Sequence, residues 1–159
     1  MAIHKLHIDE FDEIDYQLIA IHTSLEDYRL AYFLNQKLPV LFSKSKNEIQ
    51  ISIKEGTTAF TRFLYEIPDR EVEWNLIQNK NEVVSGNDNS ANLFASADMA
   101  VATTVYLLPE FKKVDYFLKI ENAEIPLDDI IDNIQSIAQV STVYTVDTTK
   151  IKSKNNLIF

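Results

Sequence analysis

Glycine, cysteine and histidine are all scarce in this chain of 159 residues, and each shortage excludes a class of functional site. The only glycines, Gly56 and Gly86, lie far apart, whereas loops that bind dinucleotides or phosphates need closely spaced glycines so that backbone N–H groups can approach phosphate. The absence of cysteine excludes thiol nucleophiles, iron–sulfur clusters, Cys-type zinc sites and disulfides. We therefore expect no cofactor.

The charge balance argues against two classes of partner. The chain carries 24 acidic residues against 15 Lys and Arg, for a net charge of −9, and this field repels nucleic-acid backbones and anionic membrane surfaces. No stretch reaches the roughly eighteen apolar residues of a spanning helix, and the N-terminus does not resemble a signal peptide. The sequence therefore predicts a cytoplasmic protein that binds neither nucleic acid nor membrane.

Three histidines are the only imidazoles available for a metal site or a general base. His4 and His7 would point to opposite sides of a strand, and no spacing among the histidines and nearby acids matches a known ligand pattern. A solvated acidic segment is therefore favoured over a metal site. The same scarcity argues against a Ser-His-Asp triad, for which His22 is the sole histidine near a strand end. The candidate metal ligands are His4, His7, His22, Asp9, Asp12 and Asp15.

The N-terminal half predicts a strand, a helix and a set of antiparallel strands. Residues 16–22 are apolar on both faces, which is typical of a central strand. A helix is expected from Leu25 to Lys37, with Ser24 as its N-cap, followed by a short strand at 40–42. Alternation at 49–53, and turns at 55–57 and 67–70, predict a three-strand meander with 59–67 and 72–76.

The C-terminal half begins with a polar segment, 81–104, which we expect to be a loop, and its 85–92 portion lacks any period. Residues 105–108 and 114–121 favour a strand pair, with a helix across 107–121 as the alternative. A clear amphipathic helix runs from Leu127 to Gln139, followed by a strand at 140–147. Residues 150–154 alternate like an edge strand protected by lysines.

These elements predict one domain over residues 1–159, of the α+β class. Both ends of the chain show the order strand, helix, strand, and antiparallel strands lie between them. The expected architecture is a two-layer sandwich in which the two helices cover a mostly antiparallel sheet.

One segment resembles the signature of the IPExxxVDY family of Bacteroidota proteins: Leu108-Pro109-Glu110, three residues, then Val114-Asp115-Tyr116. Leu108 replaces the isoleucine of the family name. Further similarity covers residues 27–31, 34–35, 74–80 and 152–159. The resemblance implies an intracellular bacterial protein with no assigned activity, whose gene tends to lie near genes for ribonuclease III and fatty-acid synthesis.

The residues of this motif have two interpretations. Glu110, Asp115 and Tyr116 are chemically suited to act as an acid, a base and a proton relay. A turn at Pro109 and Glu110, fixed by carboxylates that accept backbone N–H groups, is the simpler reading and is favoured. We therefore assign no catalytic residue and expect Leu108, Pro109, Glu110, Val114, Asp115 and Tyr116 to be structural.

Two groups of residues are candidates for a partner surface. Tyr28 and Tyr32, four residues apart on the first helix beside Arg29, form a protein-binding face if they point outward, although packing against the sheet is the default. The tail carries apolar side chains that are expected to be buried. Docking on the protein's own sheet is favoured, and a groove on a second copy or on another protein is the alternative. The tail candidates are Lys150, Lys152, Lys154 and Phe159.

The leading hypothesis is a non-enzymatic protein-interaction or adaptor domain, whose partner is another protein or a second copy. The alternative is a regulatory domain that senses a small molecule, because the order strand, helix, strand is similar to that of ACT-like domains. An enzyme is the third hypothesis, and Glu110, Asp115 and His22 are the residues to substitute first.

Overall fold

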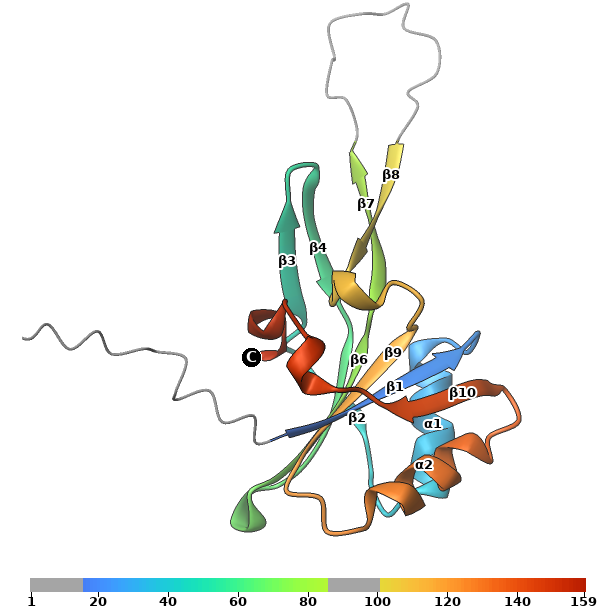
Figure 1. Ribbon diagram of the computed structural model, residues 1–159. Coiled ribbons are helices and arrows are strands. Elements are labelled where there is room, and N and C mark those ends of the chain that lie inside the picture. The colour runs from blue at the N-terminus through green and yellow to red at the C-terminus, as the bar shows by residue number, and fades with distance from the viewer. Residues whose placement is uncertain (1–15, 86–100) are drawn as a thin grey trace, which may run out of the picture.

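The computed structural model describes residues 16–85 and 101–159, and its centre is a six-stranded antiparallel sheet (Figure 1). The expected α+β class with a mostly antiparallel sheet and two helices is confirmed. Across the sheet the strands are ordered β10 (Val140–Thr145), β1 (Tyr16–Thr23), β9 (Tyr116–Glu121), β6 (Val72–Gln78), β5 (Arg62–Ile67) and β2 (Ser43–Lys44).

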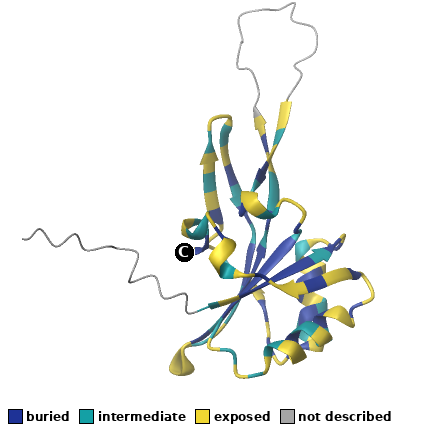
Figure 2. Cartoon of the chain, viewed as in Figure 1, coloured by how far each residue is buried: buried dark blue, intermediate teal, exposed yellow. Residues whose placement is uncertain are grey.

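The middle strands are buried on both faces, which explains why their sequences are apolar in nearly every position. Ile19 of β1 lies opposite Leu118 of β9, which in turn lies opposite Leu76 of β6. Figure 2 shows these strands as the most continuously buried part of the molecule.

One face of the sheet is covered by the helices α1 (Asp27–Lys37) and α2 (Leu127–Gln135), whose buried side chains join Ile19, Trp74 and Leu118 in one core. Both helices are shorter than expected. α1 begins two residues after Leu25, and its N-cap is Glu26 rather than Ser24. α2 ends at Gln135 instead of Gln139.

The end of α2 has a local cause. The Ser136 hydroxyl donates to the carbonyl of Asn133 at 2.6 Å, a bond from side chain to main chain that competes with helix continuation. Ile137 is still buried in the core, so the apolar spacing that predicted a longer helix reflects a turn that packs on the same face.

The opposite face, here called the second face, has its own apolar core. Two hairpins, β3 (Ile49–Ile53) with β4 (Gly56–Phe60) and β7 (Lys80–Ser85) with β8 (Val101–Tyr106), pack there with the C-terminal segment. Figure 1 shows the hairpins extending beyond the sheet, away from the helices. The two-layer sandwich is not confirmed, because both faces of the sheet carry packed elements.

The expected meander is wrong in one respect. The chain does not run as one strand from 59 to 67, because it leaves the β3–β4 hairpin at Thr61 and enters the central sheet as β5. The expected pairing of 49–53 with the strand after the 55–57 turn is confirmed as β3 with β4, and β5 pairs with β6 as expected, around the 3-10 turn Pro68–Arg70. The short strand expected at 40–42 lies instead at Ser43–Lys44.

The second half differs in how its strands pair. Both ends of the expected 81–104 loop are strands, in β7 and β8, and residues 86–100 lie outside the described part of the chain. Strand rather than helix is confirmed at Tyr116–Glu121. However, β8 and β9 do not pair with each other: β8 pairs with β7, and β9 lies between β1 and β6.

The lysine-protected edge strand expected at 150–154 is wrong. This segment forms the 3-10 turns Thr148–Lys150 and Lys154–Leu157, and it packs on the second face through Ile151 and Leu157. Asp147 begins the first turn by accepting from the amide and the hydroxyl of Thr149, and these bonds lower the pKa of Asp147. Within the described ranges, no helix has the length and apolar character needed to cross a membrane.

Candidate functional site

The residues of the family-like motif lie where the chain passes from β8 into β9, around a buried asparagine. Asn79, which is fully buried, accepts from the Leu108 amide at 2.9 Å and donates to the carbonyls of Phe111 at 2.9 Å and Val114 at 2.8 Å. Its main chain bonds to Leu107 and Asp115. Asn79 therefore holds both ends of the turn at Pro109.

Sequence reasoning missed Asn79 as the organiser of this turn. The available signal was an amide side chain directly after an apolar strand, in the segment 74–80 that resembles the family. Asparagine carries both a donor and an acceptor, so one buried side chain serves amides and carbonyls at once. The apolar side chains of the preceding strand cannot form such bonds.

The ionisable residues of the motif each have a partner within the fold. The Asp115 carboxylate accepts from the Thr23 amide and from the Lys80 ammonium, both at 3.0 Å, and Glu110 accepts from the Ser153 hydroxyl at 2.7 Å. The Tyr116 hydroxyl donates to the carbonyl of Leu25 at 2.7 Å. These bonds tie the turn to β1, β7, the start of α1 and the C-terminal segment.

Burial raises the pKa of the Tyr116 hydroxyl well above its usual value, and neighbouring carboxylates add to the rise. A phenol that stays protonated and donates to a fixed carbonyl acts as a structural donor and does not relay protons at neutral pH.

The three residues named for an enzyme hypothesis are not joined to one another. Glu110 bonds to Ser153 and Asp115 to Thr23 and Lys80, while His22 Nε2 lies 3.0 Å from the Tyr144 hydroxyl. In residues 16–85 and 101–159, no group of three His, Asp or Glu side chains is arranged to hold a metal ion. The candidate ligands His4, His7, Asp9, Asp12 and Asp15 lie outside the described residues.

Tyr28 and Tyr32 point outward from α1, so the expectation that they pack against the sheet is wrong. Each is 59% exposed, and Arg29 beside them is also exposed. A hydrogen bond with the Glu26 side chain raises the pKa of Tyr28. Two aromatic side chains four residues apart, with the Arg29 guanidinium next to Tyr28 in sequence, make an amphipathic surface, which we call the α1 tyrosine face.

The tail candidates lie on the opposite side of the sheet from this face (Figure 1). Leu157 is buried in the second-face core, whereas Ile158 is 77% exposed, so the tail docks on the protein's own sheet only in part. Lys150 and Lys152 are exposed and Lys154 is half-buried. The two groups of candidates therefore do not form one continuous partner surface.

Two buried cations hold the tail in place. Lys119 donates to the carbonyl of Leu157 at 3.1 Å, pairs with Glu121 at 2.9 Å, and lies 4.9 Å from the centre of the Phe159 ring. The guanidinium of Arg62 lies 4.7 Å from the same ring. Cation–π contacts of this kind are stronger when the cation is desolvated, as both are here.

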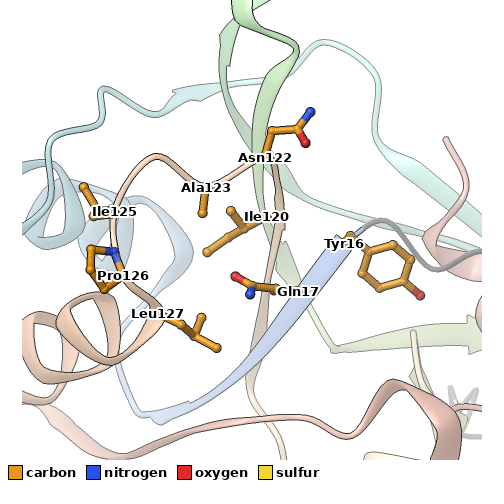
Figure 3. A pocket seen from close by; sticks show the side chains of 8 residues that line it. All are labelled: Tyr16, Gln17, Ile120, Asn122, Ala123, Ile125, Pro126 and Leu127. Atoms are coloured by element: carbon orange, nitrogen blue, oxygen red, sulfur yellow. The ribbon is translucent and has the colours of Figure 1, made fainter.

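A pocket of about 440 Å³ opens between the start of β1, the end of β9 and the loop that leads into α2 (Figure 3). In Figure 3 the Tyr16 ring points away from the aliphatic side chains, and burial raises the pKa of its hydroxyl. The lining holds two amide side chains and no acidic or basic one. Its residues are Tyr16, Gln17, Ile120, Asn122, Ala123, Ile125, Pro126 and Leu127.

Comparison of the chain with protein-family models, with curated proteins and with solved structures gave no match. The resemblance to the IPExxxVDY family therefore stays a prediction. The described residues offer two candidate binding features: an exposed aromatic helix face and a pocket lined by aliphatic and amide side chains.

Proposed function

We propose that this protein is a non-enzymatic interaction domain, located inside the cell, that binds a protein partner through the α1 tyrosine face. The observation that carries the proposal is the exposure of Tyr28 and Tyr32, at 59% each, on a helix whose opposite side is buried in the core. Tyrosine and arginine are the residue types most often found as energetic anchors of protein interfaces.

The proposal also accounts for the motif residues without giving them a chemical role. Glu110, Asp115 and Tyr116 are engaged by groups of the same chain, so they serve to fix the turn between β8 and β9. The partner we expect is a folded protein with a recess for two tyrosine rings and a carboxylate or carbonyl for Arg29.

The test compares capture from native cells by the wild-type chain, by the double variant Tyr28→Ala, Tyr32→Ala, and by Ile158→Ala. Ile158 is a matched control because it is an exposed apolar side chain on a different part of the molecule. We expect one protein to be retained by the wild type and by Ile158→Ala and to be lost by the double variant.

The captured protein is then purified and titrated against the same three chains. Loss of two anchors is expected to weaken its affinity by at least about thirtyfold, since an anchor residue typically contributes 2 kcal/mol or more. Equal affinity for the wild type and a correctly folded double variant would refute the α1 tyrosine face as the binding site.

The second candidate function is small-molecule sensing, and the pocket in Figure 3 is the observation that favours it. Its volume of about 440 Å³ and its lining of aliphatic and amide side chains suit a compact, uncharged metabolite held by the amides of Gln17 and Asn122. A saturating ligand is expected to raise the melting temperature of the wild type but not of Ala123→Leu, which fills the pocket. An unchanged melting temperature across a metabolite panel would contradict this candidate.

A further inference from the structure

The central sheet ends on one side in a strand that lacks the usual protection against pairing. Among residues 16–85 and 101–159, β10 pairs with β1 alone. The opposite edge strand, β2, has two residues, one of them Lys44, and so offers little to a second strand. β10 has six residues, Val-Ser-Thr-Val-Tyr-Thr, with no charge and no proline.

The lysines expected to protect an edge strand do not lie on this edge. Residues 150–154 turn onto the second face, where Ile151 and Leu157 are buried. Four of the six β10 residues are exposed (Figure 2). An uncharged, exposed edge strand of this length is a template for pairing with another strand.

The hydrogen bonds of β1 show which main-chain groups of β10 are free to pair. The Val146 amide donates to Leu18, so in an antiparallel ladder the groups of Tyr144 also face β1, whereas those of Val143 and Thr145 point away from the sheet. The same alternation places the carbonyl of Ile21, opposite Val143, toward β9, where it accepts from the Asp115 amide. In the described chain, no hydrogen bond reaches the main chain of Val143 or Thr145 from beyond this edge.

We propose that β10 pairs antiparallel with β10 of a second copy of this chain, about a twofold axis at Tyr144. Val143 of each copy then exchanges two main-chain hydrogen bonds with Thr145 of the other, about four in all, and the two sheets become continuous. The irregularity where β10 leaves β1, next to Thr23, lies outside this pairing.

Charge and side chains favour a second copy as the occupant. The chain carries a net charge of −9, but β10 itself has no charged residue. Two copies can therefore pair along β10 without placing like charges opposite each other. Tyr144, which is 39% exposed, would lie directly opposite its counterpart, and aromatic cross-strand pairs are favourable. A single strand pair buries less area than a stable interface, so we expect a dissociation constant of about 10 to 500 µM.

The first test is sedimentation equilibrium of the full chain from about 1 µM to about 1 mM, a range that brackets the expected dissociation constant. The wild type is expected to shift from 18.3 kDa toward twice that mass. Thr145→Pro removes an N–H that the monomer does not use, and it is expected to stay monomeric. Thr145→Ala keeps that N–H and is expected to associate like the wild type.

The second test uses the absence of cysteine from the chain. In the proposed dimer, the two Tyr144 Cα atoms are about 4.5 Å apart, as in a non-hydrogen-bonded pair, which a disulfide can bridge. Tyr144→Cys is therefore expected to form a covalent dimer under mild oxidation at least ten times faster than Gln36→Cys, an exposed position on α1.

A wild type that stays monomeric to 1 mM would overturn the proposal, even if β10 binds another protein. A folded Thr145→Pro that associates like the wild type would do the same, as would equal rates of cross-linking for Tyr144→Cys and Gln36→Cys. The double variant Tyr28→Ala, Tyr32→Ala is expected to keep wild-type association. Loss of binding at the α1 tyrosine face is thus distinguishable from loss of dimerisation.

Discussion

Replacing Asn79 by alanine tests whether one buried amide holds the turn between β8 and β9. The substitution removes an acceptor from the Leu108 amide and a donor from the carbonyls of Phe111 and Val114. The carbonyl of Phe111 keeps the Val114 amide as a partner, so two groups are left without one: the Leu108 amide and the Val114 carbonyl.

Each buried group left unpaired costs about 1–3 kcal/mol, so Asn79→Ala is expected to lower the free energy of unfolding by about 4 kcal/mol. Urea denaturation followed by far-UV circular dichroism measures this change, with the m-value as a check that the unfolded states are comparable. Relative to the wild type, Asn79→Ala is also expected to speed amide exchange more at 107–115 than in β1.

Asn122→Ala is the matched control. Asn122 also donates from its side chain to a main-chain carbonyl, that of Glu71 at 2.8 Å, but it is exposed, so water replaces the lost bond. Its backbone is left-handed (φ 53°), which favours asparagine over alanine, so its expected cost is about 1 kcal/mol in all. A cost for Asn79→Ala that does not exceed that of Asn122→Ala would refute the role assigned to Asn79.

Three further predictions concern other parts of the fold. Tyr116→Phe is expected to cost about 1–2 kcal/mol at pH 7. Because the pKa of Tyr116 is raised by folding, the wild type should also lose about 1.4 kcal/mol more stability per pH unit than this variant above pH 10, and parallel alkaline denaturation curves would contradict this. Gly56→Ala is expected to cost about 1–3 kcal/mol of stability, because the Gly56 φ is +148° and an added Cβ would lie 2.9 Å from Val83 Cγ1. Adding Val83→Ala relieves only the contact, so thermal denaturation of the double variant should show only part of the loss recovered. Lys119→Met is expected to speed amide exchange at Ile158 about tenfold, with Lys150→Met as a control that leaves it unchanged.

Periodicity was sufficient to predict which side of α1 is exposed, although the aromatic character of Tyr28 and Tyr32 favoured the wrong side. At 100° per residue, Tyr28 and Tyr32 lie about 160° and 200° around the helix from Leu30, whereas Leu34 lies about 40° from it. The apolar stripe through Leu30 and Leu34 therefore already placed both tyrosines on the opposite side. The error came from treating aromatic side chains as core residues by type rather than by angle.

Strand existence was predictable from local pattern, but strand pairing was not. The alternation of Val, Tyr and Ile identified β9 correctly, yet nothing within 105–121 indicates that β8 would leave the central sheet and pair with β7. The turn between these strands is bonded at both ends by Asn79, from a distant part of the chain. Contacts between residues about thirty positions apart leave no periodic signal in either segment.

The unprotected β10 edge and the burial of Lys119 and Arg62 both follow from the way the C-terminal tail packs. A tail with lysines at alternate positions suits an edge strand, but Leu157 and Phe159 are drawn to the second face, where Lys119 binds the Leu157 carbonyl and both Lys119 and Arg62 lie over the Phe159 ring. Once the tail packs there, its lysines are no longer available to β10, and the neutral strand is left as the edge of the sheet. The position of the tail therefore determines whether β10 is open to pairing. That position depends on the buried cations Arg62 and Lys119, and no local pattern in the sequence predicts their burial.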